Sequence, residues 1–135
     1  MNPEDYPPQE PLSDFAKPYH QEVLRLAHDS EPAEHFFGKN AYQSLAVFQP
    51  EVPNGSALIM WHGGGWTNGY KEWMYFVAPA VTPHGITFIS AGYRLAPQHV
   101  FPAGFTDCAR AIAWVYNNAT DLNIDPTRIF LSGHS

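Results

Sequence analysis

The sequence has a single cysteine and few basic residues. Cys108 has no partner for an intramolecular disulfide, and no cysteine–histidine cluster has the spacing of a metal site. The chain has 7 lysines and arginines against 13 aspartates and glutamates, a formal net charge of −6. Nucleic-acid binding needs clustered positive charge, so this class is disfavoured. We expect no metal, no cofactor and no nucleic-acid partner.

Long apolar runs are also absent. No stretch approaches the roughly 20 apolar residues that a membrane-spanning helix needs. Residues 1–11 are acidic and rich in proline, and they lack the charged-then-apolar layout of a signal peptide. These absences predict a cytoplasmic protein without membrane contact.

What the sequence does contain is an alternation of short apolar runs and amphipathic stretches. Of its 135 residues, 44% are hydrophobic and 15% aromatic, which suits one folded domain with a modest core. Strands separated by helical stretches of about ten residues or more indicate βαβ units, and so an α/β fold whose mostly parallel sheet has helices on both faces. The spacing predicts strands over 44–49, 57–61, 86–91 and 128–132, helices over 14–28, 72–81 and 105–118, an irregular arm over 1–12 and a connector over 31–40.

Some of these elements carry more specific expectations. Pro79 should end or kink the helix over 72–81. The strand over 128–132 is predicted to be buried, and a parallel strand needs cover on both faces of its sheet. Because no helix follows it, we expect the domain to be incomplete in this chain. The buried stripe of the helix over 105–118 is predicted to consist of Phe105, Ala109, Ile112, Ala113 and Tyr116.

A glycine-rich loop follows the apolar strand over 57–61. It reads His62-Gly63-Gly64-Gly65-Trp66. Consecutive glycines let the backbone turn sharply and leave N–H groups pointing outward with no side chain in the way. Such donors can hold the oxyanion that develops in acyl transfer. A simple turn or a phosphate-binding loop is the alternative, although the G-x-G-x-x-G and G-K-[ST] patterns of nucleotide sites are absent.

The last predicted strand leads into Gly133-His134-Ser135. This is the first half of the G-x-S-x-G nucleophile elbow, which lifts a serine off the tip of a strand. The elbow is cramped, so the residue two before the serine must be small, as Gly133 is. A serine after Gly-x is also common in ordinary loops. Its position after the glycine loop and two βα units favours Ser135 as a nucleophile.

A third segment has no evident chemistry of its own. It reads Tyr93-Arg94-Leu95-Ala96-Pro97 and continues to His99-x-Phe101-Pro102-Ala103. Together with HGGGW and the stretch 125–135, it resembles the hormone-sensitive-lipase-like esterases of the α/β-hydrolase superfamily, from about residue 42 onward. That family often has glutamate where Gln98 stands and Phe or Tyr where Trp66 stands. The form with Trp66 also resembles the kynurenine formamidases, which share the fold and cleave a formamide.

The resemblance implies a serine hydrolase in which Ser135 attacks a carbonyl carbon. The N–H groups of Gly64 and Gly65, with a third from the residue after Ser135, would form the oxyanion hole, and His62 would brace the loop. The triad acid and histidine follow the serine in this fold. Both would therefore come from the remainder of the same protein after Ser135, and His134 is not the expected base.

Acidic residues before the serine are assigned structural roles instead. Asp107 is expected in the first turn of its helix, and Asp125 in a turn or cap before the last strand. Residues 1–40 are interpreted as an N-terminal arm and helix, a candidate cover for the active site. Residues 41–135 would be the N-terminal half of the α/β-hydrolase domain.

Three functions stay open at this point. The first is a carboxylesterase acting on a small acyl or aryl ester, and the second is an arylformamidase. The third is a non-catalytic protein that binds a small ligand on the same fold. Each implies a small molecule as partner, and a homodimer is compatible with all three.

Overall fold

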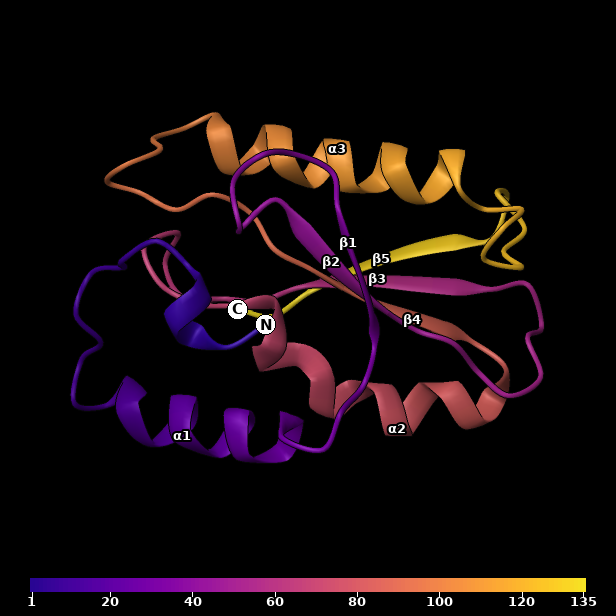
Figure 1. The fold of residues 1–135 in the computed structure, drawn as a ribbon, viewed down its shortest axis with the longest axis horizontal. Coiled ribbons are helices and arrows are strands. Elements are labelled where there is room, and N and C mark those ends of the chain that lie inside the picture. Colours follow the sequence, from indigo (N-terminus) through magenta and orange to yellow (C-terminus); the bar gives the residue numbers. More distant parts are fainter.

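A computed structural model describes all residues, 1–135, as one sheet covered by helices on both faces (Figure 1). The strands are β1 (Ala33–Phe36), β2 (Ser44–Phe48), β3 (Ala57–Trp61), β4 (Thr87–Ala91) and β5 (Ile129–Gly133). The helices are α1 (Ala16–Ala27), α2 (Ala78–Val81) and α3 (Ala103–Asn117), with 3-10 helices at Pro3–Asp5, Lys71–Val77 and Thr82–His84. The strand order is β1-β2-β4-β3-β5, with α3 on one face and α1 and α2 on the other.

The sheet is antiparallel at one end and parallel at the other. β2 pairs antiparallel with β1 and β4, whereas β3 pairs parallel with β4 and β5. The α/β class is confirmed, and the parallel half is the part in which strands alternate with helices. Trp61 lies opposite Ala91 on one side and Gly133 on the other. The loops after β3, β4 and β5 therefore leave the sheet at the same edge.

Successive residues of the central strands pack on opposite faces of the sheet. On β4, Ile89 joins a cluster with Val115 of α3, while Phe88 joins a cluster with Val23 of α1 and Met74. All five side chains are buried, and full burial of such a side chain contributes roughly 1.5–3 kcal/mol to stability. The two clusters hold the strands rigidly beneath the loops at the edge.

The segment after the glycine loop differs from its prediction as one helix over 72–81. It begins with the 3-10 helix Lys71–Val77 and passes into the short α2. Pro79 lies in the first turn of α2, where its missing N–H has no intrahelical partner to lose. The connector over 31–40 contains β1, a strand of 4 residues that is too short to show a clear alternation.

The predicted buried stripe of α3 is wrong. The buried residues are Asp107, Ala111 and Val115, whereas Phe105 and Tyr116 are 71% and 59% exposed. The expectation placed only apolar side chains on the buried face. In the structure the carboxylate of Asp107 is fully buried, because it has partners there, and the helix is turned accordingly.

β5 is more exposed than its apolar sequence predicts. Within residues 1–135 it pairs with β3 alone, and Phe130 and Leu131 are 57% and 55% exposed. The expectation that this strand is buried on both faces is therefore wrong for the residues described.

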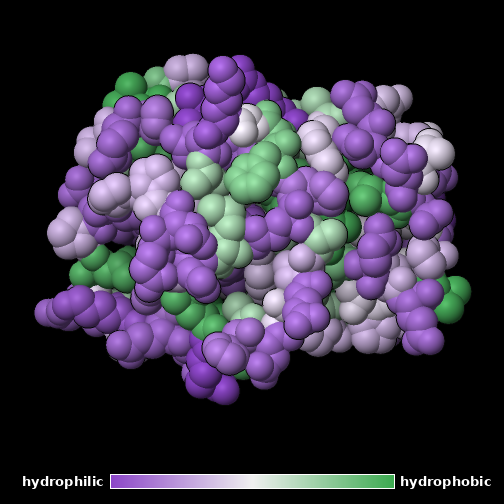
Figure 2. All heavy atoms as spheres, viewed as in Figure 1, coloured by the Kyte–Doolittle hydropathy of each residue, from purple (hydrophilic) through white to green (hydrophobic).

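The face seen in Figure 2 is mainly hydrophilic, with smaller apolar patches between the polar side chains. No helix in the structure combines the length and apolarity that crossing a bilayer requires.

Candidate active site

The glycine loop and the end of β5 meet at the carboxyl edge of the parallel strands. A methyl group placed on Gly63 would lie 2.8 Å from Cβ of Ser135 and 2.9 Å from the carbonyl oxygen of His134. Unbonded carbon atoms normally stay about 3.5–4.0 Å apart. The two motifs are thus in direct contact, and only glycine at position 63 allows it.

The glycine loop offers backbone donors that have no partner. Gly64 and Gly65 have φ angles of +122° and +62°, values that glycine adopts readily. The carbonyl oxygen of Gly64 accepts hydrogen bonds from the N–H groups of Thr67 (3.2 Å) and Asn68 (3.0 Å), which closes the loop into a turn. The N–H groups of Gly64 and Gly65 themselves donate no hydrogen bond. They are free to bind an anionic oxygen.

Ser135 has a backbone conformation that is unusual for a residue with a side chain. Its φ angle is +68°, in the left-handed region that costs a non-glycine residue roughly 1–2 kcal/mol. The G-x-S-x-G elbow holds its serine in such a strained turn. The expected crowding at Gly133 is not found, since no atom of residues 1–135 lies within 4 Å of a methyl group there. The crowding lies at Gly63 instead.

The side chain of His134 packs against α1. Its ring stacks on Tyr19 of α1, with centroids 5.7 Å apart and planes inclined by 3°. No hydrogen bond joins the hydroxyl of Ser135 to any histidine of the chain. The geometry therefore agrees with the inference that His134 is not the base.

His62 is buried behind the loop. Its Nδ1 lies 2.6 Å from the carbonyl oxygen of Gly63, which can only accept, so Nδ1 carries the proton. The ring stacks on Tyr93 at 4.5 Å, and the Tyr93 hydroxyl donates to the His62 carbonyl oxygen (2.9 Å). Burial lowers the pKa of His62 to about 4, so the ring is neutral near pH 7. These contacts suit a residue that braces the loop.

A buried ion pair fixes the segment after β4, and it was not foreseen. Asp107 accepts hydrogen bonds from the backbone N–H of Arg94 (3.0 Å) and from its guanidinium (2.8 and 2.9 Å). The amide of Gln43 donates to the same carboxylate (2.8 Å). Burial alone would raise the pKa of Asp107, but the hydrogen bonds from Arg94 and Gln43 outweigh it and lower the pKa.

This corrects the expectation for Asp107 and bears out the one for Asp125. α3 begins at Ala103, so Asp107 lies beyond the first turn and is fully buried. Asp125 accepts hydrogen bonds from the backbone N–H (2.8 Å) and the hydroxyl (2.6 Å) of Thr127, as a turn residue does.

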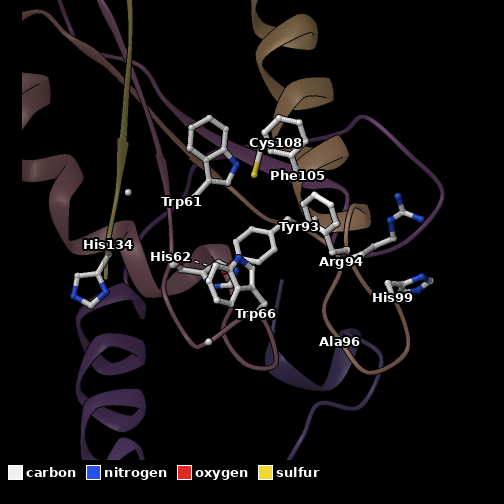
Figure 3. A pocket seen from close by; sticks show the side chains of 14 residues that line it. Trp61, His62, Trp66, Tyr93, Arg94, Ala96, His99, Phe105, Cys108 and His134 are labelled. Carbon is white, nitrogen blue, oxygen red and sulfur yellow. Dashed lines mark hydrogen bonds between the residues drawn. The ribbon is translucent and has the colours of Figure 1, made fainter.

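A cavity of about 660 Å³ opens beside the loop and the elbow (Figure 3). Gly65 and Gly133 border it, and five of the other twelve lining residues carry large aromatic rings. Trp66 is 74% exposed at its mouth, and its carbonyl oxygen accepts from the N–H of Ala96 (2.8 Å). The rings come from four separate segments, so no local pattern in the sequence marks them as a set. They are Trp61, Trp66, Tyr93, Phe101 and Phe105.

Comparison with known proteins gives consistent relatives. A profile of the family described as "alpha/beta hydrolase fold" matches residues 58–135. Carboxylesterase NlhH of Mycobacterium tuberculosis is 41% identical over 95 residues, which are 67% of this chain and 30% of that protein. An arylesterase of Saccharolobus solfataricus is 34% identical over 93 residues, with the same two shares.

A solved structure of an esterase also resembles this chain. A hyperthermophilic esterase from the archaeon Pyrobaculum calidifontis superimposes with a TM-score of 0.74 at 25% identity, covering 90% of this chain and 42% of that one. The chain thus spans less than a third of the length of the curated relatives named above, and less than half of this structure.

Proposed function

The chain belongs to the α/β-hydrolase family, and from this we propose that it is the nucleophile-bearing part of a serine carboxylesterase. The observation that carries the proposal is the contact between Gly63 and Ser135. It brings the strained serine against a loop with two unpaired N–H donors. Acyl transfer through an acyl-enzyme uses both a nucleophile and an oxyanion site, and here the two lie side by side.

The reaction would run in two steps. The hydroxyl oxygen of Ser135 attacks the ester carbonyl carbon while a histidine takes its proton, and the N–H groups of Gly64 and Gly65 stabilise the resulting oxyanion. The intermediate collapses to an acyl-serine, and the alcohol leaves with the proton from the histidine. Water then attacks the acyl-serine and releases the carboxylic acid. We infer that the histidine and its acid lie outside residues 1–135.

The cavity suggests the class of substrate. Its aromatic lining suits an uncharged acyl or aryl group, because burying apolar surface supplies most of the binding free energy there. Arg94, the charged residue of the lining, is already paired with Asp107. We therefore propose a small acyl or aryl ester as substrate. The alternative of an arylformamide also fits an aromatic cavity, and it differs in its leaving group.

We further propose that segment 1–40 covers one side of the site. Tyr19 of α1 stacks on His134, next to the nucleophile. His20 of the same helix accepts a hydrogen bond from the indole N–H of Trp73 (3.0 Å), which fixes the helix against the protein. α1 therefore covers the side of the site on which His134 lies.

The first experiment compares the full-length protein with its Ser135→Ala variant. The wild type should hydrolyse p-nitrophenyl butyrate and become labelled by a fluorophosphonate, which reacts with activated serines. In the variant labelling should vanish, and kcat should fall by about 10⁴-fold or more, as nucleophile removal does in serine hydrolases.

The same assay separates the alternatives. Faster turnover of N-formylkynurenine than of phenyl acetate would assign the arylformamidase activity instead. Saturable ligand binding without labelling or turnover would assign a non-catalytic binder. A cytoplasmic location and a homodimer stay predictions, to be tested by cell fractionation and by light scattering.

A further inference from the structure

We propose that Gln9, in the N-terminal arm (residues 1–12), is a positioning residue for the oxyanion hole; this rests on the function proposed above. The glycine-rich loop that begins at His62 extends to Gly69, and the side-chain amide of Gln9 pairs with the backbone of Gly69. Gln9 Nε2 donates to the Gly69 carbonyl oxygen (2.8 Å), and the Gly69 N–H donates to Gln9 Oε1 (2.8 Å). Both backbone groups of Gly69 are thus satisfied by one side chain from 60 residues away.

The neighbouring residues reinforce this pairing. The side-chain amide of Asn68 donates to the carbonyl oxygen of Glu10 (2.5 Å). Two consecutive loop residues are therefore tied to two consecutive arm residues. No other part of the chain makes hydrogen bonds to the backbone of Gly69. Hydrogen bonds to the backbone of Gly69 therefore come from the arm alone.

Gly69 is in turn packed against the catalytic half of the loop. Its φ angle is +116°, and a methyl group on it would lie 2.1 Å from His62 Nδ1 and 2.6 Å from the Gly63 carbonyl oxygen. In the same way, a methyl group on Gly64 would lie 2.1 Å from the Asn68 carbonyl oxygen. These distances leave no room for a side chain at either glycine, so the backbone at residues 68 and 69 packs directly against residues 62–64. Groups packed this closely do not move independently. A shift of residues 68 and 69 is therefore passed to the residues that carry the free N–H groups.

The arm can serve as a support because it is anchored on the protein itself. Tyr6 is 8% exposed, and its hydroxyl donates to the Glu72 carboxylate (2.8 Å) and accepts from Lys71 Nζ (2.6 Å). Tyr6 lies three residues before Gln9. Its hydroxyl contacts the ion pair between Lys71 and Glu72, in which the lysine side chain is fully buried. One residue after Tyr6, the carbonyl oxygen of Pro7 accepts from the Tyr42 hydroxyl (2.7 Å). Gln9 is thus held in place before any substrate arrives.

The position of Gln9 indicates which kinetic constant it should affect. Gln9 lies behind the loop and is absent from the lining of the cavity, so substrate binding does not need it. The oxyanion forms only as the carbonyl carbon is attacked, so donor placement stabilises the transition state more than the bound ester. Loss of the Gln9 amide should therefore lower kcat and leave KM nearly unchanged.

The test uses Gln9→Met in the full-length protein, with Gln21→Met as the matched control. Methionine keeps the length of the side chain and removes both hydrogen bonds, and Gln21 is an exposed residue of α1. With active sites counted by fluorophosphonate titration, kcat of Gln9→Met should fall about 10- to 100-fold, the scale of a misplaced catalytic group. KM should stay within about twofold, and affinity for a trifluoromethyl ketone should fall in parallel with kcat.

A second variant keeps the proposal testable if Gln9→Met folds poorly. In Gln9→Glu the introduced carboxylate can still accept from the Gly69 N–H but repels its carbonyl oxygen. When protonated it can donate as the amide does, so the ratio of variant to wild-type kcat should rise as the pH is lowered from about 8 to about 5. A ratio that does not change with pH, or a Gln9→Met variant with wild-type kcat per site, overturns the inference alone. A wild-type protein that neither reacts nor turns over overturns the proposed function and the inference with it.

Discussion

At the scale of single residues, Gly63 shows how closely the two motifs depend on each other. Substitution Gly63→Ala would place a methyl group 2.8 Å from Cβ of Ser135, so the loop or the elbow must move. A shift approaching 1 Å between nucleophile and donors costs about 100-fold in rate. We expect a fall in kcat of this order with little change in the melting temperature, both measured on the full-length protein.

Gly65→Ala provides the comparison for this prediction. A methyl group there meets no atom within 4 Å, and only the positive φ of +62° opposes it. The strain of about 1–2 kcal/mol should appear mainly as lower stability. Equal losses of kcat in both variants would mean that backbone conformation, rather than contact with Ser135, accounts for the glycine at position 63.

At the scale of elements, the sequence predicted the parallel strands better than the parts that hold the site. The strands over 57–61, 86–91 and 128–132 are found within one residue, because short apolar runs bounded by turn residues are a local signal. The motif residues Gly63 and Ser135 were selected in the same way, and the structure places them in contact. Each of these predictions depends only on residues that are close together in the sequence.

Contacts between distant segments were not predictable in this way. Gln9 and Gly69 are 60 residues apart, and nothing in either neighbourhood indicates that they pair. Asp107 was expected only in the first turn of its helix, yet it is buried, where Arg94 and Gln43 satisfy its carboxylate. Such pairs depend on the folded arrangement, so no periodic pattern reports them.

The N-terminal arm carries an element-scale prediction. Tyr6→Phe removes the hydroxyl that links Lys71 to Glu72 and leaves both buried charges short of one partner. An unsatisfied buried polar group costs about 1–3 kcal/mol. The free energy of unfolding, measured by urea denaturation, should fall by this amount. In the control Tyr116→Phe the lost hydroxyl belongs to an exposed ring, and a Tyr6→Phe variant as stable as this control would contradict the prediction.

At the scale of the whole molecule, the buried histidine behind the loop links stability to pH. Burial lowers the pKa of His62 from 6.5 to about 4. Between these pH values the imidazole is protonated in the unfolded chain and neutral in the folded protein. Between these two values the unfolded state carries more protons, and stability falls as the pH is lowered. The shift corresponds to a loss of about 3 kcal/mol, complete near pH 4.

Asp107 acts in the same direction over a lower range of pH. Its pKa is lowered from 3.8 in the folded protein, so its contribution is present above that value and is lost as the pH falls through the lowered pKa. The two groups therefore act one after the other during acid unfolding. His62 contributes to the decline between pH 6.5 and about 4, and Asp107 contributes to the decline below it.

Urea denaturation of the full-length protein at a series of pH values tests the assignment to His62. In His62→Gln the side-chain amide can still donate to the Gly63 carbonyl oxygen but does not titrate. Whatever its stability at neutral pH, the variant should lose clearly less free energy of unfolding between pH 6.5 and 4 than the wild type does. His84→Gln, which replaces an exposed histidine, is the control. If the stability of His62→Gln depended on pH as steeply as that of the wild type, a group other than His62 would bind the proton. The assignment of the acid destabilisation to the buried, neutral His62 would then be wrong.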